Sequence, residues 1–229
     1  MKQRVQKIMS ANGFCSRRRA EVFIKNGKVK VNDKVIKLGD QASEDDVIKI
    51  NDKVLKKANK IYVKFHKPRG CVTAVYDRYE KTVMDYIKIK ERVFPVGRLD
   101  KDTSGLLLLT NDGDFANHIT HPSNEIKKTY LVGLYTDIDE RKLKKLEAGV
   151  RLEDGKTAPA KVKIHHEKLV QIEIHEGKNR IIRRMFRAIG YEVNFLKRIR
   201  VGKLNLGKLP EGRYAFLKVE QGKKWPDIF

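Results

Sequence analysis

The sequence predicts an α+β protein built from two unequal domains. Short apolar runs bounded by glycine, such as Phe94 to Val96 and Leu106 to Leu109, are typical of core strands. Residues 28–36 alternate with a period of two, which predicts a hairpin, and residues 179–190 show the strongest helical periodicity in the chain. The polar run at 56–60 predicts a linker, so we expect a small domain at 1–60 and a larger domain at 61–229.

The charge of the chain indicates a polyanionic partner. The sequence holds 51 Lys and Arg residues against 29 Asp and Glu residues, a formal net charge of +22. Such an excess favours nucleic acid first and an acidic membrane surface second. The longest purely apolar run is Leu106 to Leu109, far short of a membrane span, and the first residues hold no apolar signal core, so we expect a cytoplasmic protein.

The two cysteines, Cys15 and Cys71, lie far apart in the sequence and neither is close to a cluster of histidines or further cysteines. This spacing predicts neither a disulfide framework nor a zinc site, and we expect no metal in the protein.

The first domain should begin with two short helices. Val5, Ile8 and Met9 mark the inner face of a first helix ending near Gly13, and Ser16 is placed to cap a second helix that Gly27 ends. The hairpin at 28–36 turns at Asn32 and Asp33, and a further strand is expected at 47–52.

Cationic residues gather at the start of the second helix. Within residues 1–60, 16 Lys and Arg residues against 7 Asp and Glu residues leave a charge of +9. Three consecutive arginines at a helix start oppose the helix dipole, which favours phosphate contact over simple solvation. The run SRRRAEVFIKNGKVKVNDKVI resembles the alpha-L RNA-binding domain, the fold shared with small-subunit ribosomal protein S-four. That resemblance implies an RNA-binding face lined by Arg17, Arg18, Arg19, Lys25 and Lys28.

The second domain alternates strands with short helices. After a strand from residue 61 and a turn at 67–70, we expect helical pieces at 80–88, 114–120 and 139–149, and strands at 125–134, 162–166, 169–174, 192–206 and 213–219. The helix at 179–190 has one apolar face, formed by Ile181, Ile182, Met185, Ala188 and Ile189. Its other face carries Arg180, Arg183, Arg184 and Arg187 without carboxylates to balance them, which favours phosphate binding.

The polar loop between the two core strands holds the candidate chemistry. Four acidic residues lie close together in the sequence at Asp100, Asp102, Asp112 and Asp114. Turn and helix capping explains the last two. A metal-dependent phosphatase fits poorly, because the first aspartate does not directly follow a hydrophobic strand. The remaining interpretation is one carboxylate acting as nucleophile or base on RNA, kept ionised by Arg183 or Arg184.

The stretch GRLDKDTSGLLLLTNDG resembles the signature of the ribosomal RNA pseudouridine synthases that carry an N-terminal alpha-L domain. The segments FHKPRGCVT, KKTYLV and EGKNRIIRRMFRAIG support it in the order that the family requires, and one departure is Ile181, where many relatives have Gln. The resemblance implies a central, mostly antiparallel mixed sheet flanked by helices.

The resemblance also implies a role for each site residue. Asp100 is the catalytic aspartate, Arg183 its partner, Arg98 the residue that helps to expel the target nucleotide, and Tyr130 the ring that stacks on the uracil, although a lone tyrosine in a strand is more often core. The implied reaction, uridine to pseudouridine with base flipping, needs no cofactor.

The implied substrate is ribosomal RNA or a pre-ribosomal particle, acted on by a monomer. The segments EGKNRIIRRMF and LEDGKTAPAK favour the large-subunit branch of the family. The alternatives are a small-subunit enzyme and a non-catalytic RNA-binding or ribosome-assembly factor.

Overall fold

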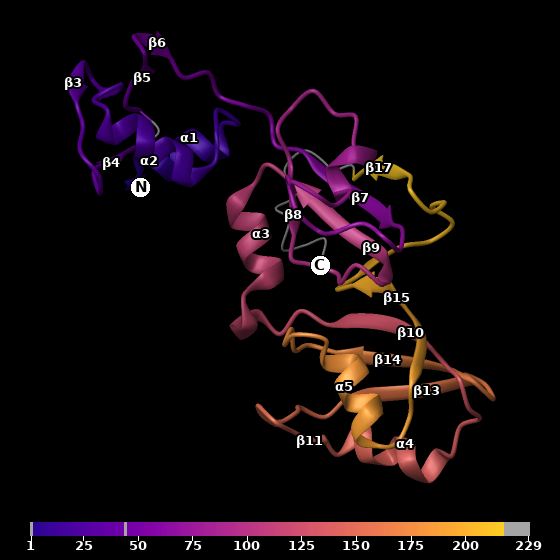
Figure 1. Cartoon of the computed structure of the whole chain (residues 1–229). Helices are drawn as coiled ribbons and strands as arrows, with labels where there is room; N and C mark the ends of the chain where they lie inside the picture. The colour runs from indigo at the N-terminus through magenta and orange to yellow at the C-terminus, as the bar shows by residue number, and fades with distance from the viewer. Residues whose placement is uncertain (1, 44, 218–229) are drawn as a thin grey trace. The chain divides into compact units, whose positions relative to one another are not determined.

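The computed structural model describes residues 2–43 and 45–217 of the chain, which divides into two units (Figure 1). Unit 1 comprises Met1–Ile61, Ile89–Phe94 and Thr110–Gly113, and unit 2 comprises the remaining residues. Two segments distant in sequence thus belong to unit 1. Asn111 ties one of these segments, Thr110–Gly113, to residues 59–61. Its side chain accepts a hydrogen bond from the amide of Ile61 at 2.9 Å and donates one to the carbonyl of Asn59 at 2.7 Å.

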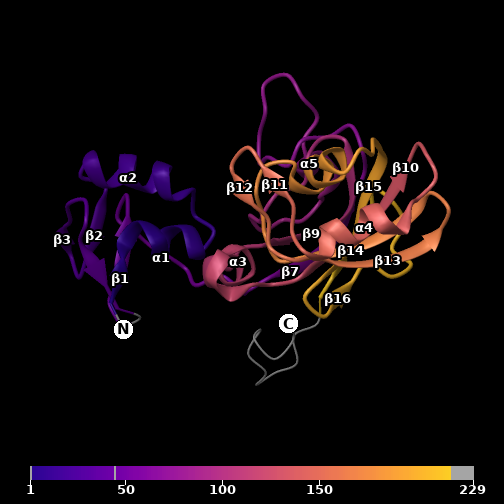
Figure 2. The ribbon, with the colours of Figure 1, turned by 90° about the horizontal axis from the view of Figure 1, so that it is seen from below.

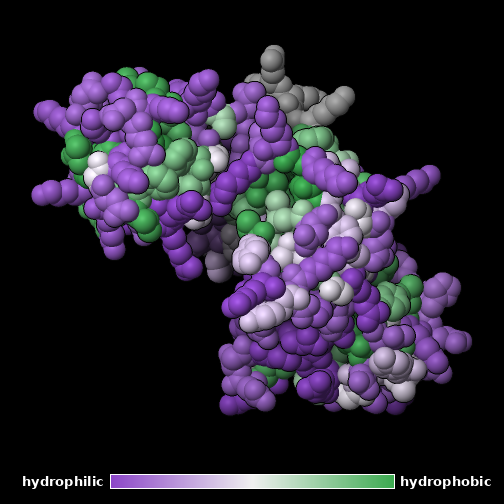
Figure 3. Space-filling view, turned by 45° about the horizontal axis from the view of Figure 1, so that its top comes forward, coloured by the Kyte–Doolittle hydropathy of each residue, from purple (hydrophilic) through white to green (hydrophobic). Residues whose placement is uncertain are grey.

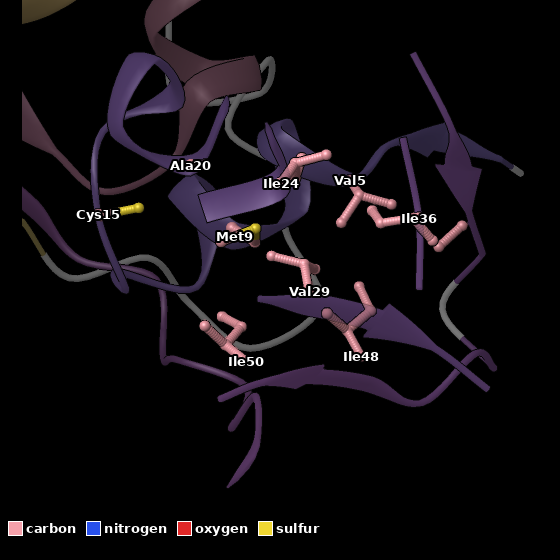
Figure 4. Close-up of a cluster of buried hydrophobic side chains, with 10 residues drawn as sticks. Val5, Met9, Cys15, Ala20, Ile24, Val29, Ile36, Ile48 and Ile50 are labelled. Atoms are coloured by element: carbon pink, nitrogen blue, oxygen red, sulfur yellow. The ribbon is translucent and has the colours of Figure 1, made fainter. Parts of the chain in front are cut away.

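Unit 1 is a pair of helices packed on small sheets. The helices are α1 (Val5–Ala11) and α2 (Arg17–Lys25). One sheet has the order β3-β2-β5-β6, and β1 pairs with β4 in a second. The strands are β1 (Gln3–Arg4), β2 (Val29–Val31), β3 (Lys34–Val35), β4 (Gln41–Ala42), β5 (Ile48–Ile50) and β6 (Lys53–Val54). Apolar side chains from both helices and from β2 and β5 meet in one core (Figure 4).

The capping and turn residues expected in unit 1 are confirmed. The Ser16 hydroxyl accepts a hydrogen bond from the amide of Arg19 at 3.2 Å and so caps α2. Asn32 and Asp33 adopt φ values of 50° and 64°, the left-handed conformation of a two-residue hairpin turn between β2 and β3. These contacts hold the start of α2 and the hairpin in fixed positions within unit 1.

Unit 2 is organised by a nine-stranded sheet. Its main path is β13-β14-β10-β15-β9-β7-β17, with β16 added to β15 and β8 added to β9. The strands are β7 (Tyr62–Lys67), β8 (Phe94–Val96), β9 (Thr103–Thr110), β10 (Lys128–Leu134), β13 (Lys161–His166), β14 (Leu169–Ile174), β15 (Val193–Val201), β16 (Leu204–Asn205) and β17 (Tyr214–Phe216). β10 runs antiparallel to β14 and β15, whereas β15 and β9 are parallel, so the expected mixed sheet is confirmed.

Strand β9 begins earlier than the sequence pattern predicts. The polar residues Thr103 and Ser104 were expected in the loop, but both are buried and pair with β15. Gly105 permits this approach, because it has φ +111° and a Cβ there would lie 2.2 Å from the carbonyl oxygen of Arg198. The loop before β9 is therefore shorter, ending at Asp102.

The helices of unit 2 are short, and α4 and α5 lie on the same side of its sheet (Figure 2). They are α3 (Gly113–Thr120), α4 (Glu140–Glu147) and α5 (Ile181–Ala188), with 3₁₀ turns η1 (Val83–Tyr86) and η2 (Pro122–Asn124) and a small hairpin of β11 (Arg151–Leu152) and β12 (Gly155–Lys156). The buried residues of α5 include Phe186, whereas Ala188, expected inside, is exposed.

Two expected elements differ in extent. The helix at 80–88 reduces to η1, because Thr82 and Asp85 form a capping box that starts the turn only at Val83. Of the strand expected at 213–219, β17 covers Tyr214–Phe216, and residues 218 and 219 lie outside the described residues. Within residues 2–43 and 45–217, no helix is long and apolar enough to cross a membrane. Hydrophilic side chains cover most of the face in Figure 3.

Candidate active site

The site is built on the aspartate loop, residues 97–102, which joins β8 to β9. Gly97 begins the loop with φ +70°, and the carbonyl of Asp100 accepts a hydrogen bond from the amide of Thr103 at 3.0 Å. Leu99 is buried, Asp100 is half-buried and Arg98 is exposed. The backbone therefore fixes a tight turn that leaves the Asp100 carboxyl and the Arg98 side chain partly or fully open to solvent.

A buried lysine lies beneath this loop. Lys67, the last residue of β7, has 0% exposure, and its Nζ donates to the carbonyls of Pro68 and Thr103, both at 2.9 Å, and of Lys101 at 3.4 Å. Burial lowers the pKa of Lys67, and the nearby acidic groups Cys71, Asp102 and Asp100 oppose that shift. Lys67 thus binds the backbone directly after Asp100, at Lys101 and Thr103, and also the carbonyl of its own neighbour Pro68.

Two guanidinium groups from the start of α5 converge on Asp102. Arg180 binds its carboxylate in a bidentate pair, with Nη1–Oδ1 at 3.3 Å and Nη2–Oδ2 at 3.1 Å, and Arg183 Nη2 lies 3.0 Å from Oδ2. Burial raises the pKa of Asp102, but the Arg180 hydrogen bond and the charge of Arg183 outweigh it, so that pKa lies below its usual value. This ion-pair cluster joins α5 to the aspartate loop.

Arg183 therefore has a different partner from the one expected. Asp100 was the predicted partner, whereas the Arg183 guanidinium contacts the carboxylate of Asp102 and donates to the carbonyl of Val193 at 3.0 Å. Asp102, the residue directly before β9, is the carboxylate that contacts the start of α5, through Arg180 and Arg183. Asp100 still acts on Arg183 electrostatically, because its charge raises the pKa of Arg183 against the larger lowering effect of burial.

Tyr130 lies in the middle of the sheet. It occupies β10 between Ile172 of β14 and Arg198 of β15, and it is 8% exposed. Arg198 is 4% exposed, and its Nε donates to the carbonyl of Leu106 at 2.7 Å. Two residues before Tyr130, burial and the charge of Arg198 lower the pKa of Lys128 to about 8. The tyrosine thus has a buried guanidinium, Arg198, and a half-buried ammonium, Lys128, on neighbouring positions of the sheet.

The other predicted RNA-binding residues are on the surface of their own units. In unit 1, Arg17, Arg18, Arg19, Lys25 and Lys28 are exposed along α2 and the turn that follows it. In unit 2, Arg187 is exposed, whereas Arg184 is half-buried and forms an ion pair with Asp154 in the turn between β11 and β12. Arg184 therefore already has an anionic partner in this structure.

Three side chains around the site were not singled out from the sequence, namely Lys67, Lys128 and Arg198, and Asp102 was named among the clustered carboxylates but given no role. The signal for Lys67 was the KPRG turn, and that for Asp102 was its place between Asp100 and the buried strand. The burial of Arg198 and the partial burial of Lys128 follow from strand pairing and leave no local signal. Within the part of the chain that the structure describes, no cluster of three or more His, Cys, Asp or Glu side chains could hold a metal ion.

Exposed arginines on α2 and a half-buried carboxylate in the field of an arginine fit an enzyme that acts on RNA. The chain belongs to the RNA pseudouridylate synthase family, whose model matches residues 61–188, and an S4 domain model matches residues 3–48. It is therefore an isomerase with an N-terminal S4 domain, as the sequence predicts.

Similar proteins extend over almost the whole chain. "Ribosomal large subunit pseudouridine synthase B" of Bacillus subtilis (strain 168) is 48% identical over 92% of this chain and 90% of that protein. "Dual-specificity RNA pseudouridine synthase RluF" of Escherichia coli (strain K12) is 36% identical over 93% of this chain and 75% of its own length. A solved structure described as "Crystal structure of pseudouridylate synthase" is 34% identical, covers 94% of this chain and 96% of that chain, and has a TM-score of 0.70.

Proposed function

We propose that this enzyme converts a uridine of large-subunit ribosomal RNA to pseudouridine, with Asp100 as the catalytic carboxylate. One observation carries the assignment: Asp100 is a half-buried carboxylate close enough to Arg183 for the two charges to interact. The loop that holds Asp100 is bonded to Lys67 through the carbonyl of Thr103. Two cationic side chains thus lie near the carboxylate that would act on the RNA.

The reaction is an isomerisation, so no atom is gained or lost overall. The bond from uracil N1 to the ribose anomeric carbon breaks, the detached base rotates, and a bond forms from uracil C5 to the same carbon. The C5 proton then leaves, and N1 gains a proton. The Asp100 carboxylate can start this sequence by attack on the anomeric carbon or by removal of a ribose proton, and both routes require it to be ionised.

The neighbouring side chains take supporting roles in this proposal. Arg183, held by Asp102 and the carbonyl of Val193, supplies positive charge beside Asp100. Arg98 lies two residues before Asp100 and is exposed, so its side chain can fill the gap that the flipped uridine leaves in the stack of RNA bases. Tyr130 would support the flipped uracil by stacking, which recovers roughly 1–3 kcal/mol per base against a flipping cost of a few kcal/mol.

The exposed cations are proposed to hold the RNA. Residues 1–60 act as the RNA-binding domain through the arginines of α2, and residues 61–229 form the catalytic domain with Arg180, Arg184 and Arg187 as phosphate contacts. The full charge of +22 supports a large polyanion as substrate, either ribosomal RNA or a pre-ribosomal particle, bound by a monomer in the cytoplasm. The name of the Bacillus subtilis relative and the segments EGKNRIIRRMF and LEDGKTAPAK favour the large subunit.

Substitution of Asp100 by Asn tests the assignment. We expect Asp100→Asn to abolish pseudouridine formation in a large-subunit ribosomal RNA transcript, while its Kd for that transcript changes by less than about tenfold, ~1.4 kcal/mol. The matched control is Asp137→Asn, which removes the same charge from an exposed pair with Lys168 and should keep full activity. Full activity in Asp100→Asn would exclude this carboxylate as the catalytic group.

A further inference from the structure

A loop beside the site has no role in the function proposed so far. Residues 72–82, which we call the tyrosine loop, connect the turn after β7 to η1. Backbone hydrogen bonds close its base, from the amide of Val72 to the carbonyl of Lys81 at 2.9 Å and from the amide of Val83 to the carbonyl of Val72 at 3.0 Å. Its two ends therefore lie together, as in the closed surface loops that often carry binding functions.

The tip of this loop presents two aromatic rings to solvent. Tyr76 is 80% exposed and Tyr79 is 86% exposed, compared with 57% for the exposed Tyr135 at the end of β10. The Arg78 guanidinium carbon lies 5.5 Å from the centre of the Tyr79 ring, a cation–π distance. Two large aromatic side chains exposed to this degree, three residues apart on one loop, indicate a binding surface rather than solvation.

The acidic residues of the tyrosine loop are used within the protein. The Asp77 carboxylate accepts hydrogen bonds from the amides of Tyr79 and Glu80 at 2.9 and 3.0 Å, which orders the tip. The Glu80 carboxylate binds the Lys101 ammonium at 2.7 Å. The groups that remain available to a ligand are the two tyrosines and the cation Arg78, so the tip suits a partner that is both aromatic and anionic.

The tyrosine loop is attached on both sides of Asp100. The Thr73 hydroxyl donates to the carbonyl of Leu99 at 2.7 Å and accepts from its amide at 3.2 Å. Glu80 binds Lys101, the next residue after Asp100. A ligand held on the tip is thereby held at a fixed offset from the catalytic aspartate, through contacts to the residues directly before and after it.

We propose that the tyrosine loop binds unpaired bases of the RNA that flank the target uridine, with Tyr76 and Tyr79 stacking on successive bases and Arg78 near their phosphates. Sequence-tolerant stacking on aromatic side chains beside a cation is the usual mode of binding to single-stranded nucleic acid. The inference rests on the proposed function, since it takes Asp100 as the catalytic residue. It restricts the substrate to a uridine within a single-stranded loop or bulge and excludes one inside a continuous duplex.

The test compares tyrosine variants with a matched tyrosine elsewhere in unit 2. Tyr76→Ala and Tyr79→Ala are expected to raise both KM and Kd for a large-subunit ribosomal RNA transcript roughly tenfold each, with kcat at saturation within about twofold. Tyr76→Phe and Tyr79→Phe keep the ring and should stay near the wild type. Tyr135→Ala, which removes an exposed tyrosine remote in sequence from the loop, should also leave both constants unchanged.

Salt dependence separates stacking from phosphate contact. Because no charge is removed, the slope of log Kd against log salt should be the same in both tyrosine variants as in the wild type, whereas Arg78→Gln should reduce it by about one. A fluorescent 2-aminopurine placed next to the target should be quenched by the wild type and not by the doubly substituted Ala protein. Unchanged melting temperatures would confirm that these exposed substitutions leave the fold intact.

The outcomes distinguish this inference from the proposed function. Tyrosine variants with wild-type KM and Kd on an active enzyme would overturn the stacking surface alone, whereas a wild-type protein without isomerase activity would overturn the function. A reduced salt slope in Tyr76→Ala or Tyr79→Ala would replace stacking by an electrostatic contact. Defects limited to pre-ribosomal particles, with naked RNA bound normally, would identify the loop as a protein-docking surface and also refute the proposal.

Discussion

Replacement of Lys67 by Met tests how the aspartate loop is held. The substitution keeps the length and apolar stem of a fully buried side chain but removes the ammonium that donates to the carbonyls of Pro68, Lys101 and Thr103. Lys101 keeps a second donor, the amide of Gly70 at 2.8 Å, so the loss falls mainly on Pro68 and Thr103. We therefore expect a looser backbone on the C-terminal side of Asp100 and at the turn that follows β7.

The magnitude follows from those two bonds. Hydrogen bonds from a charged donor contribute about 1.5–3 kcal/mol each, so two bonds contribute about 3–6 kcal/mol. Methionine avoids the desolvation cost of the buried ammonium, which is visible as the lowered pKa of Lys67 and offsets part of this sum. The net expectation is a loss of about 2–4 kcal/mol in the free energy of unfolding, together with a fall in kcat of at least tenfold.

The assay is urea unfolding followed by circular dichroism, paired with single-turnover pseudouridine formation on the same preparation. Lys64→Met is the matched control, because it removes a partly exposed lysine from the same strand, β7, and surface changes usually stay within about 0.5 kcal/mol. If Lys67→Met proved as stable and as active as Lys64→Met, the lysine would not position the loop. Lost stability with full kcat would limit its role to folding.

Two further substitutions test the packing around the site. Gly105→Ala should destabilise unit 2 by about 3 kcal/mol or more, because the new Cβ would lie 2.2 Å from the Arg198 carbonyl oxygen and separate β9 from β15. Gly105 also has φ +111°, a conformation that alanine rarely adopts. A loss of stability below about 1 kcal/mol in thermal unfolding would contradict this close approach. The pKa of Lys128, lowered by burial to about 8, predicts a pH effect. Between pH 8 and 10.5 the unfolded state binds more protons than the folded state, so stability rises with pH, and wild type should gain roughly 1–3 kcal/mol over Lys128→Met across this window in urea titrations. If the difference in unfolding free energy between wild type and Lys128→Met did not change with pH, the lowered pKa of Lys128 would be refuted.

Local sequence patterns predicted most elements because each depends on neighbouring residues. The Ser16 cap, the Asn32–Asp33 turn and the helix at α5 are all determined within a few positions of the chain, and the structure confirms them. The start of β9 could not be predicted in this way. Thr103 and Ser104 are polar and look like loop residues, and only pairing with β15, some ninety positions later, makes them strand.

For the candidate site too, some features follow from the sequence alone and others only from the tertiary structure. The sequence by itself determined the family, the RNA-directed charge and the choice of Asp100, since a specific motif and a net charge need no coordinates. Only the tertiary structure decided that Arg183 pairs with Asp102, that Lys67 binds the backbone of the aspartate loop, and that the tyrosine loop is bonded to Leu99 and Lys101. These contacts join residues distant in the sequence, and their geometry depends on strand register and loop closure, which local side-chain periodicity does not encode.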